Sequence, residues 1–191
     1  LVGSEMCIRD SAKTIKPADP ANSIVIEPAG PQIRCGQTTV TTYHDVTYST
    51  PVTNGTKTSL KLDLQIPTTA GSKPLVIYIT GGGFVRADQA GNLNQRTYVA
   101  EQGYVVASIQ YRTTTDGATY HDAVTDVKSA IRYLRAHAAQ YRINPSKVAV
   151  WGQSAGGYLA AMTGTTNGRS QFDTGANLSQ SSNCLLYTSD A

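Results

Sequence analysis

Three short apolar runs constrain most strongly what this chain can fold into. They occupy residues 74–79, 104–109 and 147–151. A continuous apolar run of this length is typical of a strand that is buried on both faces, as in a parallel sheet. Helical patterns separate the runs, at residues 92–102 and at 121–141, where apolar residues recur at helical spacing. Because strands that alternate with helices form such sheets, the sequence predicts an α/β domain with a mostly parallel sheet.

The segments before the first run follow a different pattern. Residues 40–49 and 60–66 alternate polar and apolar side chains, and the second segment presents one apolar face, as an antiparallel strand does. Asn54-Gly55 predicts a turn between them, and Asn144-Pro145 predicts a break before the last apolar run. A further helix is expected over residues 155–162.

The two ends of the chain have an unusual character. Residues 5–11 can be read as the translation of a short DNA sequence that resembles the mosaic end used in transposase-based sequencing libraries. Cys184 to Ser189 can be read as the translation of the reverse complement of the same DNA sequence. We therefore interpret residues 1–11 and 184–191 as adapter-derived tails and leave them out of the fold prediction.

Between the tails we expect two parts. Residues 12–36 contain four prolines with little periodicity and predict an extended leader or linker, and residues 37–183 form the α/β domain. Cys35 is the single cysteine outside the tails, so no disulfide is expected within this insert. Because neither end is taken as natural, the start of the chain carries no information about a signal peptide.

Composition limits the classes of partner. Charged residues make up 15% of the chain, the net charge is +3, and the basic residues are scattered singly. This pattern does not indicate nucleic-acid binding, and the apolar runs are too short to span a membrane. We expect a small-molecule or polysaccharide-linked substrate. The low charge and the many Thr and Asn residues favour an extracellular or periplasmic location. No sequence feature indicates an oligomeric state.

A Gly-Gln-Ser-Ala-Gly motif at residues 152–156 lies between the third apolar run and the helix expected to follow it. Glycines two residues on either side allow a sharp turn that lifts the Ser154 hydroxyl above the sheet, at the start of a helix whose dipole favours negative charge. This context predicts a nucleophilic serine. The alternative is a glycine-rich turn that binds phosphate or only packs.

Residues 80–84, Thr-Gly-Gly-Gly-Phe, follow the first apolar run. Lipases and esterases that carry a G-x-S-x-G elbow place an H-G-G-G segment at this point, where its amides help to form the oxyanion hole. Glycine is needed there because the backbone itself must approach the substrate carbonyl. The two motifs occur in the expected order, which favours the catalytic interpretation over a merely flexible loop.

On these residues the chain resembles the α/β-hydrolase fold, and more narrowly its hormone-sensitive-lipase-like and feruloyl or acetylxylan-esterase-like members. The segments that carry the resemblance are residues 78–84, 104–112, 126–135 and 148–158. The resemblance implies that Ser154 is the nucleophile and that the amides of Gly82, Gly83 and Ala155 form the oxyanion hole. It also suggests ester substrates with short acyl or feruloyl groups.

The chain departs from the family pattern in two ways. Thr80 stands where the family has histidine, although its hydroxyl can still hold the loop by a hydrogen bond. In this fold the acid and the histidine follow the serine, but no histidine follows Ser154 and only Asp173 lies between Ser154 and the tail. We interpret Asp173 as a surface loop residue and expect the acid and the histidine beyond Asn183, so that this chain alone is inactive.

The remaining polar residues are assigned structural roles. His44 is expected at a solvated strand position, and His121 and His137 near the two ends of a helix. None has metal-ligand spacing, so neither a metal nor a cofactor is predicted. Arg112 is expected to pair with Asp126 without taking part in catalysis.

The sequence thus predicts a serine hydrolase that cleaves carboxylic esters through an acyl-enzyme. A peptidase or amidase on the same fold, and a non-catalytic hydrolase-like binding protein, are the alternatives. The sheet order of this fold also predicts that residues 147–151, although apolar, form an exposed edge strand and promote aggregation.

Overall fold

The computed structural model describes residues 39–190, with side chains through Leu185. The expected leader at residues 12–36, Cys35 and the tail at residues 1–11 lie outside this part of the chain. Within it, every helix is too short or too polar to cross a bilayer.

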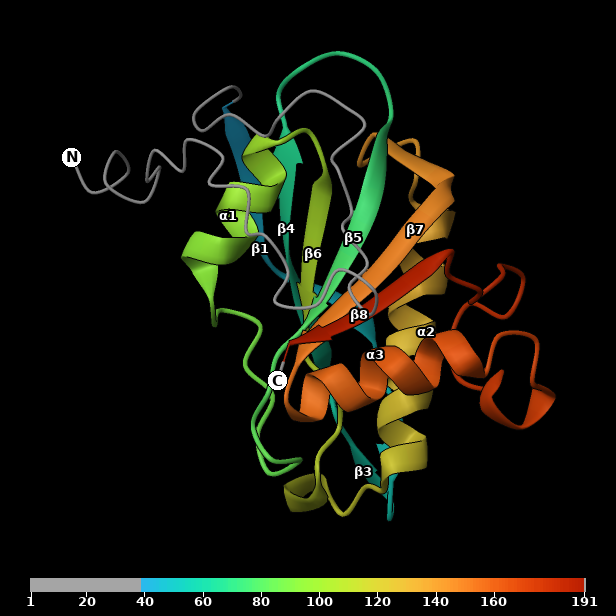
Figure 1. Cartoon of the computed structure of the whole chain (residues 1–191). Helices are drawn as coiled ribbons and strands as arrows, with labels where there is room; N and C mark the ends of the chain where they lie inside the picture. The colour runs from blue at the N-terminus through green and yellow to red at the C-terminus, as the bar shows by residue number, and fades with distance from the viewer. Residues whose placement is uncertain (1–38, 191) are drawn as a thin grey trace, which may run out of the picture. The chain divides into compact units, whose positions relative to one another are not determined.

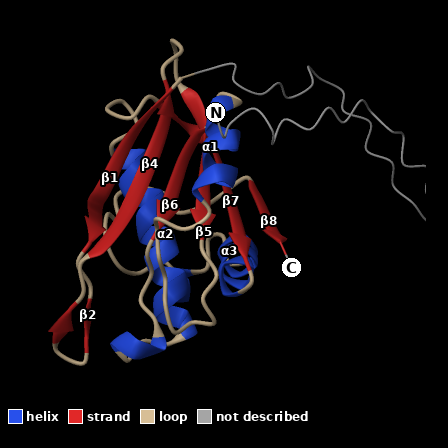
Figure 2. Ribbon diagram, turned by 90° about the vertical axis from the view of Figure 1, so that its left-hand side faces the viewer, coloured by secondary structure: helices blue, strands red, loops and turns tan. Residues whose placement is uncertain are grey.

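Six strands form one mixed sheet in the order β1–β4–β6–β5–β7–β8 (Figure 2). Their bounds are β1 Val40–Ser49, β4 Leu60–Pro67, β5 Lys73–Ile79, β6 Val105–Ile109, β7 Ile143–Gln153 and β8 Leu186–Asp190. β4 pairs antiparallel with both β1 and β6, whereas the pairs from β6 to β8 are parallel. The predicted mostly parallel sheet with antiparallel strands on one side is therefore confirmed.

Helices cover both faces of this sheet (Figure 1). They are α1 Leu93–Glu101, α2 Tyr120–Ala136 and α3 Ala155–Thr165, with short 3-10 turns η1 Thr114–Asp116 and η2 Ser170–Phe172. Because side chains alternate along a strand, Ile77 and Ile79 face the main core with α2 and α3, while Tyr78 faces the other side with Ala100 of α1. The loops at the ends of β5 and β7, which carry the predicted site residues, thus follow strands that are packed on both faces.

The predicted turn at Asn54-Gly55 joins two short strands, β2 Val52–Thr53 and β3 Thr56–Lys57. Asn54 and Gly55 have φ of 50° and 80°. Left-handed conformations at both positions are typical of a tight two-residue hairpin, for which Asn-Gly is the preferred sequence.

Three predicted elements end or begin clearly elsewhere in the structure. Helix α3 continues to Thr165 rather than ending at residue 162. Helix α2 ends at Ala136 rather than at residue 141. Strand β7 begins at Ile143 and continues through Asn144-Pro145, but its pairing with β5 jumps from Lys73–Ile143 to Leu75–Val148. The expected break is therefore a bulge inside the strand, which accommodates a proline that cannot donate to the ladder.

The polar face predicted for the segment at 60–66 is not exposed. Asp63 and Gln65 of β4 are only 3% and 2% exposed. The Asp63 carboxylate pairs with His44 and accepts the backbone N–H of Asp45, and the Gln65 amide donates to Thr97 of α1. Burial of Asp63 is compensated by partners on the adjacent strand β1, and that of the Gln65 amide nitrogen by a partner on α1, whereas Oε1 of Gln65 has no hydrogen-bond partner among the described residues.

The expectation that residues 147–151 form an edge strand is wrong. β8 pairs in parallel with β7 from Ala149–Leu186 to Gln153–Asp190, so β7 lies between β5 and β8. The N–H of Leu185 also donates to the carbonyl of Val148 at 2.8 Å. Unpaired groups of an apolar strand accept any extended segment within reach, and residues 186–190 supply one. The aggregation predicted from an uncovered β7 loses its premise.

Candidate active site

Ser154 lies at the expected elbow between β7 and α3. It is the N-cap of α3, with φ of 53° and ψ of −121°, and its exposed side chain makes no capping hydrogen bond. A non-glycine residue in such a sparsely populated region costs about 1–3 kcal/mol and persists only where the surrounding structure enforces it. The hydroxyl is therefore presented above the sheet by a strained backbone.

The two glycines of the motif are required by close packing of the backbone. A Cβ atom on Gly152 would lie 2.2 Å from the carbonyl oxygen of Gly156. A Cβ on Gly156 would lie 2.0 Å from the carbonyl oxygen of Ile79, at the end of β5. Helix α3 thus begins directly against β5, which brings the elbow close to the loop that follows β5.

The glycine loop, residues 80–84, lies against the elbow at Ser154. A Cβ on Gly81 would lie 3.0 Å from the carbonyl oxygen of Gln153 and 3.2 Å from the Cβ of Ser154. Gly82 and Gly83 have φ of 148° and 60°, which explains why the loop is built from glycine. The sequence-predicted nucleophile and loop are therefore neighbours.

A cavity of about 430 Å³ opens beside Ser154. Its lining residues are Thr80, Gly81, Gly82, Arg86, Asp88, Gly91, Asn92, Gln153 and Ser154. Gly83 is exposed and lies outside this lining. The amides of Gly82 and Gly83 donate to no acceptor among residues 39–190. Ala155 occupies the first position of α3, where an amide has no intrahelical partner. Of these residues, Gly82 belongs to the cavity wall, and its amide is free to bind a ligand there.

Sequence analysis missed a polar contact within the lining of this cavity. Asn92, with φ of 52°, donates from its side chain to Oε1 of Gln153 at 3.1 Å and to the buried hydroxyl of Tyr78. The contact ties the residue before Ser154 to the start of α1. An Asn at a helix start is a general capping signal and does not identify such a partner.

Thr80 does not hold the glycine loop in the way a long side chain could. Its hydroxyl donates only to the neighbouring carbonyl of Gly81, at 3.3 Å. The carbonyl of Thr80 instead accepts the hydroxyl of Tyr111 at 3.0 Å, in a buried position. Burial raises the pKa of Tyr111 to about 12, so this hydroxyl keeps its proton at neutral pH. Sequence analysis had given Tyr111 no role in the loop.

The three histidines have partners away from Ser154. His44 is an exposed strand residue as expected, but its Nδ1 lies 3.0 Å from the buried carboxylate of Asp63. His121 bonds through Nε2 to the carbonyl of Gln171 in η2 at 2.8 Å, and His137 bonds through Nδ1 to the carbonyl of Tyr133, one turn earlier in α2, at 2.8 Å. No recorded hydrogen bond among the described residues joins a histidine to Ser154.

Asp173 occupies a loop directly after η2, but its side chain is not a free surface group. Its carboxylate is 32% exposed and pairs at 3.0 Å with Arg132, which is 1% exposed, and it also accepts the hydroxyl of Ser182. Its observed partners give it a structural role. Among residues 39–190, no group of three or more His, Cys, Asp or Glu side chains has a metal-binding arrangement.

The predicted pairing of Arg112 with Asp126 is present. The guanidinium donates through Nε at 2.9 Å and through its terminal nitrogen at 2.8 Å, and the Arg112 backbone N–H donates to the same carboxylate at 2.9 Å. Burial disfavours the charge on Arg112, but the bonds and the charge of Asp126 outweigh it and raise its pKa. The pair lies in the interior and fixes the segment after β6 onto α2.

Comparison with known proteins agrees with this geometry. The BD-FAE family model matches residues 62–185. The chain is 35% identical over 104 residues to a probable isoprenylcysteine alpha-carbonyl methylesterase of Arabidopsis thaliana, covering 54% of this chain and 22% of that protein. It is 30% identical over 106 residues to the probable carboxylic ester hydrolase LipM of Mycobacterium tuberculosis, covering 55% and 24%.

Solved structures show the same similarity. Butyrate-bound esterase Est2 of Thermogutta terrifontis superimposes with a TM-score of 0.63 at 28% identity, over 78% of this chain and 51% of that one. The paraoxon-phosphorylated form gives 0.64 at 26% identity, over 86% and 61%. The chain therefore has the α/β-hydrolase fold. It spans about a quarter of the length of the curated relatives named here and about half that of the butyrate-bound structure.

Proposed function

Because the chain belongs to the BD-FAE family, we propose that it carries the nucleophile and oxyanion hole of a carboxylic-ester hydrolase. Ser154 is the nucleophile, and the amides of Gly82, Gly83 and Ala155 are the oxyanion donors. The observation that carries this proposal is the strained Ser154 backbone, which lies against a glycine loop with open amides.

The proposed reaction follows from these groups. The Ser154 oxygen bonds to the ester carbonyl carbon, and the carbonyl electron pair moves onto oxygen, where the amides stabilise the negative charge. Collapse of this intermediate expels the alcohol and leaves an acyl-enzyme, which water hydrolyses to the carboxylic acid and free serine. One oxyanion donor is typically worth about 3 kcal/mol of transition-state stabilisation.

The serine proton also needs a base. None of His44, His121 and His137 is bonded to Ser154. Without a base the reaction loses most of its rate, because an oxyanion hole and binding alone retain only a small residual catalysis. We therefore expect these 191 residues alone to turn over an activated ester slowly at best.

The substrate class we propose is an uncharged ester with a short acyl group. The cavity beside Ser154 is small and its wall is largely polar, with Asn92 and Gln153 in the same lining as the glycine loop. The similar esterase Est2 of Thermogutta terrifontis has been solved with butyrate bound. These two observations support short acyl groups over long chains.

Covalent labelling tests the nucleophile without requiring turnover. The lack of a base slows this attack as well, but the oxyanion amides still stabilise the developing charge, so prolonged incubation with excess reagent compares Ser154 with an ordinary serine. Paraoxon transfers a diethyl phosphoryl group to an attacking serine oxygen and releases nitrophenolate, so peptide mass spectrometry locates the modified residue. We expect Ser154 to be modified well before the exposed loop residue Ser179, and Ser154→Ala to abolish the faster labelling. The matched variant Ser179→Ala should leave it unchanged. Equal labelling of both serines would contradict the proposal.

A further inference from the structure

The glycine loop needs a hold from outside itself. Gly82, Gly83 and Phe84 all have positive φ, and the residues of this loop belong to no strand or helix. The Thr80 hydroxyl reaches only its neighbour Gly81. An amide pair that stabilises a developing charge must be fixed before the reaction, since a mobile donor loses part of its effect by having to reorganise.

The segment after β6 forms hydrogen bonds with the glycine loop both before and after the unpaired amides of Gly82 and Gly83. Before them, the Tyr111 hydroxyl donates to the carbonyl of Thr80 at 3.0 Å. After them, Thr114 donates to the carbonyl of Phe84 through its backbone N–H at 2.8 Å and through its hydroxyl at 3.1 Å. The Thr115 hydroxyl adds a bond to the next carbonyl, that of Val85, at 3.3 Å.

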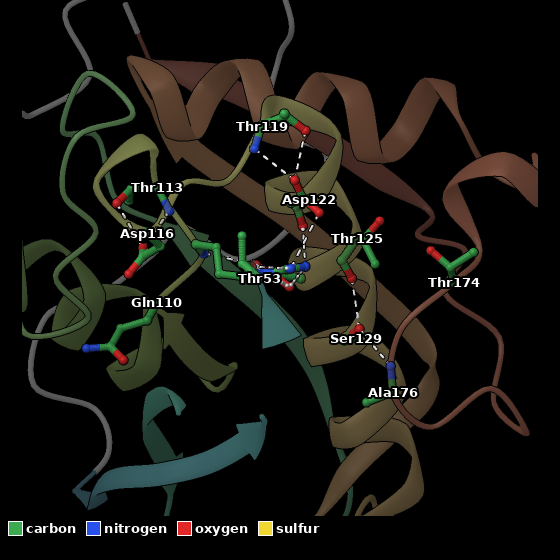
Figure 3. Close-up of polar contacts among 12 residues, drawn as sticks. Thr53, Gln110, Thr113, Asp116, Thr119, Asp122, Thr125, Ser129, Thr174 and Ala176 are labelled. Carbon is green, nitrogen blue, oxygen red and sulfur yellow. Dashed lines mark hydrogen bonds and ion pairs between the residues drawn. The ribbon is translucent and has the colours of Figure 1, made fainter. Parts of the chain in front are cut away.

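Residues 111–116, which form these bonds, are themselves bonded to one another and to other parts of the fold. Arg112, one residue after Tyr111, is locked by side chain and backbone onto Asp126 of α2. The Asp116 carboxylate accepts the Thr113 backbone N–H at 2.8 Å and the Thr113 hydroxyl at 3.0 Å (Figure 3). The hold on the loop is therefore connected through residues 111–116 to the longest helix of the described chain.

We propose that Tyr111 and Thr114 are positioning residues that hold the Gly82 and Gly83 amides in place for the oxyanion. The role rests on the proposed function, and neither side chain touches the substrate. Tyr111 provides an anchor at the same backbone position where the family pattern has a histidine, but reaches it from the segment that follows β6. Its burial, at 2% exposed, leaves no room for water to replace the hydroxyl.

The test is the binding of butyrate, followed through the amide signals of Gly82 and Gly83 by NMR of the full ¹⁵N-labelled chain. A carboxylate offers the same oxygen charge to the amides and needs no catalytic base. We expect both signals to shift on addition of butyrate. Tyr111→Phe deletes one hydroxyl and should raise the Kd roughly fivefold, since one hydrogen bond of ordinary strength is lost.

The matched control is Tyr141→Phe. Tyr141 is a buried tyrosine, 4% exposed, that packs with Tyr43 and His137 rather than with the glycine loop. Both variants lose a buried hydroxyl, so thermal unfolding reports the structural effect and the butyrate Kd reports positioning. We expect Tyr141→Phe to leave the Kd unchanged.

Thr114→Val provides a second measurement if Tyr111→Phe does not fold. It removes the hydroxyl bond to Phe84 and keeps the backbone bond, so a smaller rise in Kd, about twofold, is expected. If Tyr111→Phe folds and its Kd for butyrate is unchanged, the positioning role is overturned and the proposed function stands. If Tyr111→Phe does not fold, an unchanged Kd in Thr114→Val leads to the same conclusion. A wild-type chain whose Gly82 and Gly83 signals ignore butyrate overturns the proposed function, and the positioning role with it.

Discussion

Helices α2 and α3 begin in opposite ways. Thr119, the N-cap of α2, is extended, with φ of −104° and ψ of 172°, and both its N–H and its hydroxyl donate to Asp122 at 2.8 Å (Figure 3). Ser154, the N-cap of α3, has φ of 53°, no capping bond and no acidic residue in the first turn. The first turn of α2 is stabilised by its capping bonds, whereas the first turn of α3 leaves the Ser154 hydroxyl and the first backbone amides without capping partners.

The stable region supports the strained one. Arg112 and Thr113 attach to α2 and to the turn before it, and the same segment holds the glycine loop beside Ser154. The capped start of α2 and the buried Arg112–Asp126 pair thus anchor the segment that holds the loop against the strained Ser154 backbone. Four substitutions test this division, from the largest expected effect to the smallest.

Asp126→Ala should have the largest effect on the stable side. It removes the buried carboxylate from the Arg112 guanidinium, whose side chain is 7% exposed, and leaves that group only the longer ion pair with Asp122 at 3.4 Å. Breaking a buried pair typically costs about 3–5 kcal/mol, and we expect a loss toward the lower end of this range. Urea unfolding followed by circular dichroism measures the loss. Lys61→Ala, which breaks the exposed pair with Asp45, should cost less than about 1 kcal/mol. Equal losses in the two variants would contradict the special role of the buried pair.

Gly156→Ala should have the next largest effect, now on the strained side. The added Cβ would lie 2.0 Å from the Ile79 carbonyl oxygen, so α3 must move away from β5, at a cost of about 3 kcal/mol. Gly91→Ala is the control, because its Cβ would meet its nearest atom at an ordinary 3.4 Å. Chemical denaturation of both variants decides. A Gly156→Ala protein as stable as its control would show that the elbow is not packed as described.

Asp122→Asn should cost about 1 kcal/mol at neutral pH, the usual value of an N-terminal cap. Burial works to raise the pKa of Asp122, but the hydrogen bonds of Thr119 and the charge of Arg112 outweigh it, so the pKa is lowered. A lowered folded-state pKa means that the contribution is complete above the unfolded value, about 4, and is lost as the pH falls through the folded value.

The difference in Tm between wild type and Asp122→Asn should therefore shrink as the pH is lowered from 7 to 3. Asp88→Asn, at an exposed carboxylate, provides the control: the pH dependence of its Tm difference from wild type is the baseline for a surface group. A difference that stays constant over this range would assign the effect of Asp122 to something other than its charge.

Ser154→Gly should have the smallest effect and the opposite sign. Glycine relieves the strain at φ of 53° but adds freedom to the unfolded chain, for a net gain of about 0.5 kcal/mol. Thr119→Gly, at the unstrained cap of α2, should instead lose a few tenths of a kcal/mol, about 0.3. If calorimetry finds that both variants lose stability, the proposed contrast between the two helix starts fails.

The sequence by itself determined the features that arise from local pattern. Continuous apolar runs identified β5, β6 and β7, because a strand buried on both faces has no polar positions to interrupt it. The glycines around Ser154 predicted the elbow, since only glycine tolerates the backbone contacts that the structure shows at Gly152 and Gly156. The element types were therefore predictable, although the ends of α2 and β7 were not.

Only the tertiary structure decided which distant groups meet. The hydroxyl of Tyr111 reaches the carbonyl of Thr80, and Asn92 reaches Gln153, because strand register and helix placement bring these residues together. Likewise, β8 covers β7, which local pattern had placed at an edge. A side chain's type limits its possible partners, but its actual partner depends on the packing of segments far apart in the sequence. For that reason the nucleophile motif could be found in the sequence, and the contacts that hold the glycine loop beside it could not.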